Sequence, residues 1–129
     1  MRNYSSQLIE HFSNPRNMGA LSDADVIAEA ANPCCGDRIR LYANVCGGRI
    51  TECTFLAYGC AVALAIASLL TEAVAGQPLD ALAGWDEGRL GALAGGLSPG
   101  QRHGATLGKD VLHALVCNYR AACPKGGPV

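Results

Sequence analysis

The sequence predicts an α+β domain in which a three-stranded antiparallel sheet packs against several helices. Two runs of alternating apolar and polar residues, 38–46 and 50–57, flank the glycine pair at 47–48, which is the pattern of a β-hairpin. The apolar period then becomes helical over residues 60–75, and a second amphipathic helix is predicted to begin near Arg102. Strands followed by helices, rather than alternating with them, are typical of α+β domains.

The remaining predicted elements are shorter. Residues 5–13 are predicted to form a helix, which the proline and glycine within residues 14–19 bring to an end. Residues 25–30 are predicted to form an edge strand, the third strand of the sheet. Residues 79–100 hold many glycines and the only tryptophan of the chain, and we expect one or two short helices there.

Length and charge limit the class of protein. With 129 residues the chain has the usual size of one domain, and we expect a single domain over residues 1–129. A formal net charge of -1 provides no general attraction for nucleic acid or anionic lipid. The most apolar stretch, 60–70, is shorter than the ~20 residues that span a bilayer, and residues 1–5 lead into a helix rather than a signal-peptide core. We therefore expect a cytoplasmic protein with neither nucleic acid nor a membrane as partner.

The seven cysteines are an odd number, so they cannot all pair within one chain. In a reducing compartment they are not expected to form a disulfide framework. Cys53 is predicted to lie in the strand core and Cys46 at a strand end. Cys117 follows His113 by four residues and could share a helical face with it, although two ligands do not make a site.

The segment 32–37, NPCCGD, places the thiol of Cys35 beside the flexible Gly36 and the carboxylate of Asp37, just before a predicted strand. Glycine allows the backbone to approach a ligand closely, and the carboxylate could serve as an oxygen ligand. The alternative is a turn in which Asp37 caps its own backbone, and for this tripeptide alone the turn is the more common outcome.

Two further residues are candidate ligands. Cys60 follows Gly59 and begins a predicted helix, where free amide groups and the helix dipole are expected to lower the pKa of a thiol. The alternative is a small buried hydrophobic residue. His103 lies near the start of the last helix and is a candidate only together with the cysteines. With Cys35 and Asp37 these residues offer the soft and borderline donors that could gather around one metal centre.

Several motifs in order resemble the IscU/NifU amino-terminal family of iron–sulfur cluster assembly scaffolds. The resemblance runs from Tyr4 to about Ala122. Its motifs are EHF at 10–12, NPRNMG at 14–19, NPCCGD at 32–37, YGCA at 58–61, AS at 67–68, TE at 71–72 and RHGATL at 102–107. No insertion of the kind found in zinc-dependent SufU-like relatives separates Cys60 from His103, so the spacing resembles the IscU branch.

The resemblance implies a function and a ligand set. A cysteine desulfurase would deliver sulfur, a [2Fe-2S] cluster would be built at an exposed end of the domain, and the cluster would pass to acceptor apo-proteins. By motif, Cys35 and Cys60 match the first two scaffold cysteines, Asp37 matches the aspartate that keeps the cluster labile, and His103 matches the histidine. Iron or a [2Fe-2S] cluster is the expected cofactor, and a scaffold of this kind is not an enzyme.

The chain departs from the family pattern at two places. Gly104 stands where the family has its third cysteine. The pentapeptide LPPVK, through which an Hsp70-type chaperone recognises the family, reads LSPGQ at 97–101 and lacks the lysine and one proline. The resemblance thus implies an Hsp70-type chaperone as a candidate partner whose recognition motif is degenerate. Cys34 is an alternative source of a third sulfur.

Three functions remain open from the sequence. The first is a cluster-assembly scaffold; if the site converges, replacing Gly104 by cysteine is predicted to tighten cluster retention. The second is a zinc-binding regulatory or sulfur-acceptor protein that docks on a desulfurase without building clusters, because the same four ligands suit tetrahedral zinc. The third is a thiol enzyme, with Cys34 and Cys35 as a redox pair or Cys35 as a persulfide acceptor.

Overall fold

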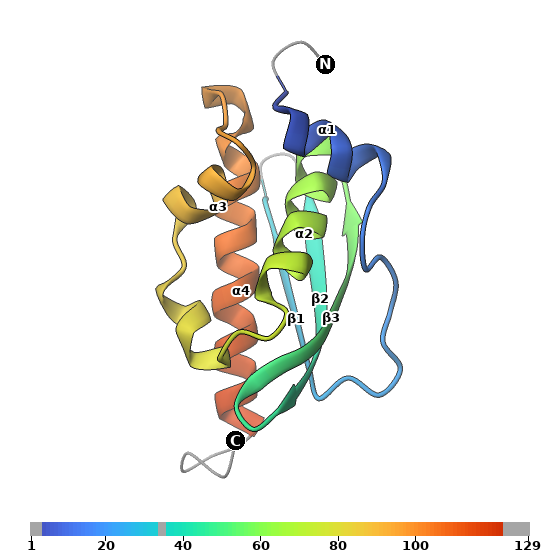
Figure 1. The fold of residues 1–129 in the computed structure, drawn as a ribbon, viewed down its shortest axis with the longest axis vertical. Coiled ribbons are helices and arrows are strands. Elements are labelled where there is room, and N and C mark those ends of the chain that lie inside the picture. The colour runs from blue at the N-terminus through green and yellow to red at the C-terminus, as the bar shows by residue number, and fades with distance from the viewer. Residues whose placement is uncertain (1–3, 34–35, 123–129) are drawn as a thin grey trace.

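The computed structural model describes residues 4–33 and 36–122, so the predicted ligand Cys35 and its neighbour Cys34 lie outside the described residues. The predicted α+β class is confirmed (Figure 1). Three antiparallel strands form one sheet in the order β1-β2-β3. The elements are α1 (Ser6–Ser13), β1 (Val26–Ala31), β2 (Arg38–Cys46), β3 (Arg49–Tyr58), α2 (Ala61–Val74), η1 (Leu79–Gly84), α3 (Glu87–Leu93), η2 (Pro99–Gln101) and α4 (Arg102–Ala122), where η marks a short 3-10 helix.

Strands β2 and β3 form the predicted hairpin. Its turn contains Gly47 with φ +61 and Gly48 with φ +77, and two positive φ angles are what a tight hairpin turn requires. The paired register runs from the turn to Arg38, which lies opposite Tyr58. The segment just before β2 and the segment just after β3 therefore meet at one end of the sheet.

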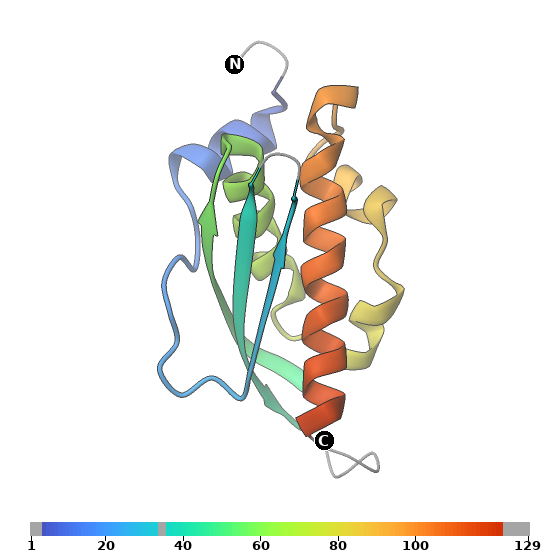
Figure 2. The ribbon, with the colours of Figure 1, turned by 180° about the vertical axis from the view of Figure 1, so that it is seen from behind.

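Helices α2 and α4 lie on one face of the sheet, and no labelled helix crosses the other face (Figures 1 and 2). Helix α4 packs against β1 and β2, α2 packs against β3, and α1 packs on α2. The alternation in residues 38–46 predicts that Ile39, Leu41, Ala43 and Val45 face inward; the first three are fully buried, and Val45 is half-buried. Tyr42, predicted on the polar face, is also buried. Within the described part of the chain, no helix is long and apolar enough to cross a membrane.

Helix α2 is more buried than its sequence pattern predicts. A single apolar face was expected, but residues on almost every side of the helix are buried, including Ala63, Ala65 and Ala67. The cause is that α2 lies between β3, α1 and α4, and its alanines let these neighbours approach closely. The helical period predicts one apolar face made of Val62, Ile66, Leu69, Leu70 and Ala73; of these, Leu69 and Ala73 are only half-buried.

Two glycines of α4 face α2 at close range. A Cβ built on Gly104 would lie 2.6 Å from Cγ1 of Val62 and 3.3 Å from Cγ1 of Ile66. A Cβ built on Gly108 would lie 3.0 Å from Cγ2 of Ile66. The distance between the two helices therefore depends on the absence of side chains at residues 104 and 108.

A buried polar network attaches α1 to α2. The Oγ of Ser68 accepts a hydrogen bond from the backbone N–H of Arg16 (2.8 Å) and lies 2.7 Å from Nδ1 of His11. The carboxylate of Glu72, which only accepts, lies with Oε1 3.5 Å from Nε2 of His11 and favours the neutral ring with its proton on Nε2. In that tautomer the hydroxyl of Ser68 donates to Nδ1. Burial, and then the positive charge of Arg16, lower the pKa of His11.

The described cysteines away from the predicted site behave as the sequence indicates. Cys53 is buried, and burial raises its pKa to about 12, whereas Cys46 is exposed. Cys117 is also exposed and free, while Nε2 of His113 lies 2.9 Å from the backbone oxygen of Trp85. Among the described residues, Cys117 and His113 belong to no group of three or more potential metal ligands.

Candidate metal centre

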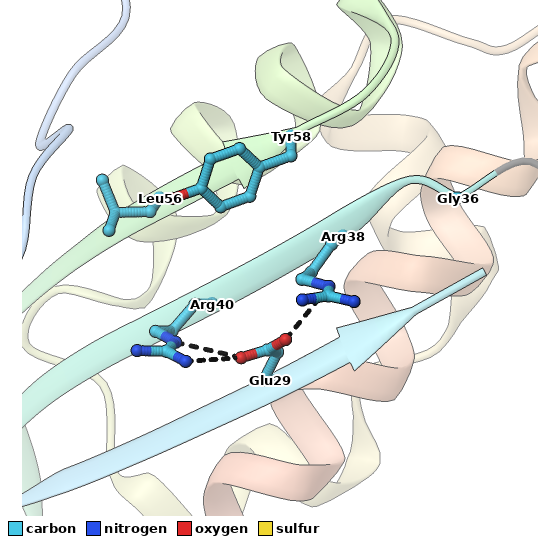
Figure 3. Close-up of a pocket in the computed structure, with 6 residues that line it drawn as sticks. All are labelled: Glu29, Gly36, Arg38, Arg40, Leu56 and Tyr58. Carbon is cyan, nitrogen blue, oxygen red and sulfur yellow. Dashed lines mark hydrogen bonds and ion pairs between the residues drawn. The ribbon is translucent and has the colours of Figure 1, made fainter. Parts of the chain in front are cut away.

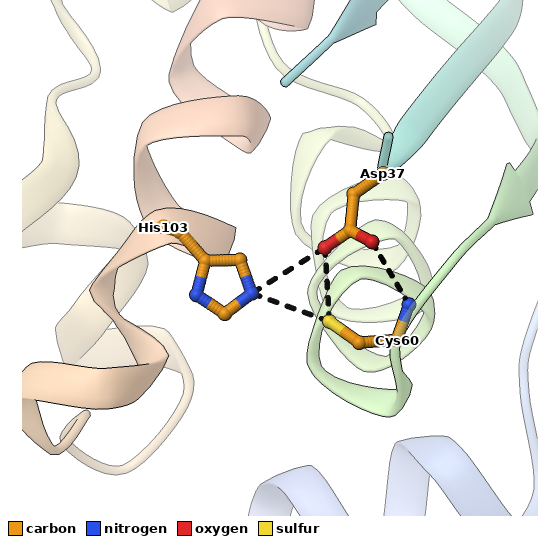
Figure 4. A group of neighbouring side chains, drawn as sticks. All are labelled: Asp37, Cys60 and His103. Carbon is orange, nitrogen blue, oxygen red and sulfur yellow. Dashed lines mark hydrogen bonds and ion pairs between the residues drawn. The ribbon is translucent and has the colours of Figure 1, made fainter. Parts of the chain in front are cut away.

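Three of the four predicted site residues lie together at the end of the sheet where β2 begins and β3 ends (Figure 4). Asp37 immediately precedes β2. Cys60 follows the end of β3 and occupies the N-cap position of α2, where its side chain makes no capping hydrogen bond, and His103 is in the first turn of α4. The hairpin register brings the first two together, and the packing of α4 beside the sheet adds the third. The fourth, Cys35, lies outside the described residues.

The donor atoms of these three side chains form a compact triangle. The Sγ of Cys60 lies 3.0 Å from Oδ2 of Asp37 and 3.2 Å from Nε2 of His103, and Nε2 lies 3.4 Å from Oδ2. Bond lengths of about 2.0–2.3 Å give a tetrahedral zinc site ligand separations of about 3.3–3.8 Å. The triangle is close to one face of such a tetrahedron, and a thiol, an imidazole and a carboxylate suit zinc or iron.

The carboxylate of Asp37 connects two segments of the chain. It is 3% exposed, and its Oδ1 accepts a hydrogen bond of 3.1 Å from the backbone N–H of Cys60. The backbone oxygen of Asp37 accepts a further bond from the N–H of Asn32, which closes the loop that precedes β2. The side chain thus reaches across to α2, which differs from the alternative of a residue that only caps its own turn.

His103 is oriented by the backbone that precedes α4. Its Nδ1 lies 3.1 Å from the carbonyl oxygen of Gly100, and because a carbonyl oxygen only accepts, Nδ1 carries the proton. In the neutral ring Nε2 then presents a lone pair toward Cys60 and Asp37 (Figure 4). A backbone contact of this kind is what usually fixes the ring of a metal-binding histidine.

The expectation that the helix start lowers the pKa of Cys60 is wrong for the metal-free protein. The backbone amides of Ala63 and Val62 do act in that direction. Burial of the thiol, and then its hydrogen bond to Asp37, outweigh them and raise the pKa of Cys60. Without a cation the sulfur is therefore a protonated thiol at neutral pH, and binding a metal must release that proton.

The structure also explains what a cysteine at residue 104 would meet. Gly104 is buried, and a Cβ there would point at Val62 and Ile66 of α2. The prediction that Gly104→Cys simply adds a third sulfur omitted this steric cost.

Gln101, which replaces the lysine of the family pentapeptide, is 5% exposed, and its side chain accepts from the N–H of Ser98 in a capping box before α4.

A pocket beside the metal centre was not predicted from the sequence. It lies on the sheet face that carries no helix. Its two arginines follow Asp37 at alternate positions of β2, and this alternation could have predicted that both lie on the same face of the sheet. Glu29 holds both: its carboxylate lies 3.1 Å from Nε of Arg38 and 2.9 Å from a terminal nitrogen of Arg40. Tyr58, next to the site, is 60% exposed. The pocket is lined by Glu29, Gly36, Arg38, Arg40, Leu56 and Tyr58 (Figure 3).

The fold and the triangle of donors define an α+β protein with a candidate metal site at one end of its sheet. The family model described as the NifU-like N-terminal domain matches residues 3–125. The chain therefore belongs to the NifU-like N-terminal domain family, and the resemblance to IscU/NifU proteins is confirmed.

Three curated relatives illustrate the range of the family. The chain is 40% identical over 118 residues to the bifunctional protein NifU/MnmA of Rubrobacter xylanophilus. This match covers 90% of the chain but only 24% of the relative. It is 34% identical over 116 residues to the iron-sulfur cluster assembly scaffold protein IscU 1 of Archaeoglobus fulgidus, covering 90% of this chain and 76% of the relative. It is 36% identical over 77 residues to the zinc-dependent sulfurtransferase SufU of Bacillus subtilis, covering 60% of this chain and 52% of the relative.

A solved structure confirms the fold independently of close sequence similarity. The N-terminal part of a nitrogen-fixing NifU-like protein from Brucella abortus superposes with a TM-score of 0.74 at 20% identity. The match covers 92% of this chain and 95% of that structure. At this identity the match shows the shared fold alone.

Proposed function

We propose that the chain, as a single domain over residues 1–129, is an iron–sulfur cluster assembly scaffold, in which iron and sulfide are the cargo. The observation that carries the proposal is the convergence of Asp37, Cys60 and His103 at an accessible edge, with donor atoms 3.0–3.4 Å apart. The family and its relatives named as scaffold proteins support it.

The proposed ligands are Cys35, Asp37, Cys60 and His103. Cys35 precedes Asp37 by two residues in sequence, which supports its inclusion as the second thiolate. A [2Fe-2S] cluster takes four protein ligands, normally thiolates, and histidine can replace cysteine. A carboxylate is a harder donor than a thiolate, so Asp37 is the ligand that we expect to release the cluster most readily.

The proposed partners are a cysteine desulfurase, which supplies sulfur, and acceptor apo-proteins, which receive the cluster. The openness of the site supports exchange with another protein: the side chain of His103 is 31% exposed, and the neighbouring Tyr58 is 60% exposed.

An Hsp70-type chaperone is left out of the proposal because Gln101, in the position of the motif lysine, is buried. A cytoplasmic location is proposed because Cys46, Cys53, Cys60 and Cys117 are free thiols.

Anaerobic reconstitution tests the proposal. The chain is incubated with ferrous iron, cysteine, a cysteine desulfurase and a dithiol reductant, which supplies the electrons that turn persulfide sulfur into sulfide. Visible absorption is then measured together with bound iron and sulfide. We expect a visible spectrum and equal amounts of iron and sulfide in the wild type, and a large loss of both in Cys60→Ser. A folded wild-type protein that gains no visible absorption would contradict the scaffold function.

A second candidate is a zinc-binding sulfur-acceptor protein that docks on a desulfurase without building clusters. The specific observation in its favour is that all three described donors face a single point, which suits one metal ion. The similarity to a zinc-dependent sulfurtransferase gives further support, and in that case the chain would take part in an enzymatic reaction. Stoichiometric zinc that stays bound when iron and sulfide are offered, with labelled sulfur reaching the chain, would favour this second function.

A further inference from the structure

Gly59 lies between the end of β3 and Cys60, at the point where the chain passes the carboxylate of Asp37. Its φ is +122, a backbone conformation that L side chains rarely adopt. A Cβ built on Gly59 would overlap Oδ1 of Asp37 and lie 2.8 Å from its Cγ and 2.9 Å from its Cα. The volume that a side chain would need at residue 59 is therefore filled by the carboxylate of Asp37, with the Cα of the same residue at its border.

The position of that carboxylate depends on the same stretch of backbone. Oδ1 accepts the N–H of Cys60 at 3.1 Å, and Oδ2 lies 3.0 Å from Sγ of Cys60 and 3.4 Å from Nε2 of His103. Gly59 provides the space and Cys60 provides the donor. Moving the carboxylate out of this space would break its bond to Cys60 and also remove Oδ2 from the triangle of donor atoms.

We propose that Gly59 is a positioning residue of the metal centre, whose missing side chain is the space that holds Asp37 against Cys60 and His103. The inference rests on the proposed function only in naming the site as metal-binding. Any other L residue at 59 turns the carboxylate away and leaves two described donors. Gly59 itself touches neither metal nor cargo, and it acts through Asp37.

Gly19 shows that a positive φ alone does not imply that a side chain would meet a neighbouring group. Gly19 has φ +135, close to that of Gly59, but a Cβ built on it meets nothing within 4 Å. Gly19→Ala therefore introduces a similar backbone strain with no collision and serves as the matched control. It lies in the segment along β3, where its N–H donates to the backbone oxygen of Phe55, away from the donor triangle.

A double-mutant cycle of Gly59→Ala and Asp37→Ala tests the inference, with cobalt(II) as the probe and its thiolate charge-transfer absorption as the readout. We expect each single variant to weaken cobalt binding by about tenfold or more, and the double variant to bind no more weakly than the weaker single variant. Gly19→Ala is expected to lower the urea midpoint while keeping the cobalt affinity of the wild type. A Gly59→Ala protein with wild-type affinity, or losses that multiply in the double variant, would overturn the inference.

Stability of the metal-free proteins provides a second readout that does not depend on the proposed function. Asp37→Ala removes Oδ1 and Cγ but keeps the Cα at 2.9 Å and the strained φ of residue 59. Gly59→Ala should therefore lower the urea midpoint less in the Asp37→Ala background than in the wild type, without being neutral there. If Gly59→Ala alone does not fold, the double variant should be the more stable of the two; an equal loss in both backgrounds overturns the inference. A wild type that binds cobalt and shows this coupling but builds no cluster would instead end the scaffold proposal.

Discussion

A Cβ at residue 104 would lie 2.6 Å from Cγ1 of Val62, so the position at which the family has its third cysteine faces α2 across a very short gap. Both residues are buried, Gly104 in α4 and Val62 in α2. The packing of these two helices and the ligand content of the site are therefore linked. A thiol at residue 104 can be gained only if α4 and α2 separate or Val62 becomes smaller.

Gly104→Cys is accordingly expected to destabilise the protein. Overpacking a core costs about 1–3 kcal/mol, and the better helix propensity of cysteine offsets only about 0.5 kcal/mol of it. In the Val62→Ala background the added side chain has room, so the free energies of unfolding of the two substitutions should not be additive. Urea denaturation of both single variants and the double variant measures this coupling.

Gly100→Cys is the control for the thiol itself, because a Cβ at residue 100 meets nothing within 4 Å. Its urea midpoint should stay near that of the wild type. An equal midpoint for Gly104→Cys and Gly100→Cys would show that α2 does not restrict residue 104 as described.

The buried His11 should make stability depend on pH. Its pKa is lowered in the folded protein, so below the unfolded value of about 6.5 the unfolded chain binds a proton more readily than the folded one. The stability that neutral His11 contributes is therefore complete above about pH 6.5 and is lost as the pH falls through the folded pKa. Within that window the slope should be at most about 1.4 kcal/mol per pH unit.

The measurement is the urea midpoint of the metal-free protein at several pH values, for the wild type and for His11→Gln. Glutamine does not titrate, so the part of the slope due to His11 should disappear, while the contributions of other groups remain. Identical slopes in the two proteins would mean that His11 is not held neutral by its burial against Ser68.

The described cysteines should differ in their reaction with iodoacetamide. Cys46 and Cys117 are exposed and should be alkylated in the folded protein. Cys53 is buried with its pKa raised to about 12, and it should react only after unfolding. Peptide mass mapping before and after denaturation resolves each site, and rapid labelling of Cys53 in the native state would contradict the burial described for β3.

Much of the fold could be predicted because local pattern and tertiary structure agree. The alternation in residues 38–46 gives the bounds of β2, and the glycine pair fixes the turn of the hairpin. The turn pairs Cys46 with Arg49, a register that would place Asp37 opposite Tyr58. A register shift between Asn44 and Val45 moves the pairing by one residue, so that Arg38 lies opposite Tyr58 and Asp37 lies beside Gly59. The strand pattern therefore predicts that the two segments meet, but not the register that aligns them. The burial of α2 on nearly all sides could not be predicted, because it depends on which elements pack around it.

The candidate site was only partly predictable for the same reason. Motif spacing identified Asp37, Cys60 and His103, and the structure brings them together. The pKa of Cys60 was predicted in the wrong direction, because helix capping is visible in the sequence whereas burial and the approach of Asp37 are not. The collision at Gly104 likewise depends on which side of α4 faces α2. A glycine has no side chain whose polarity would indicate that side in the sequence.

X-ray absorption at the zinc edge tests the central claim most directly, namely that Asp37, Cys60 and His103 hold one metal ion. The zinc-loaded wild type should show a sulfur shell at about 2.3 Å together with nitrogen and oxygen scatterers at about 2.0–2.2 Å. Cys60→Ser should lose one sulfur from that shell, and His103→Ala should lose the outer scattering of an imidazole ring. A zinc spectrum that is unchanged in both variants would contradict the account.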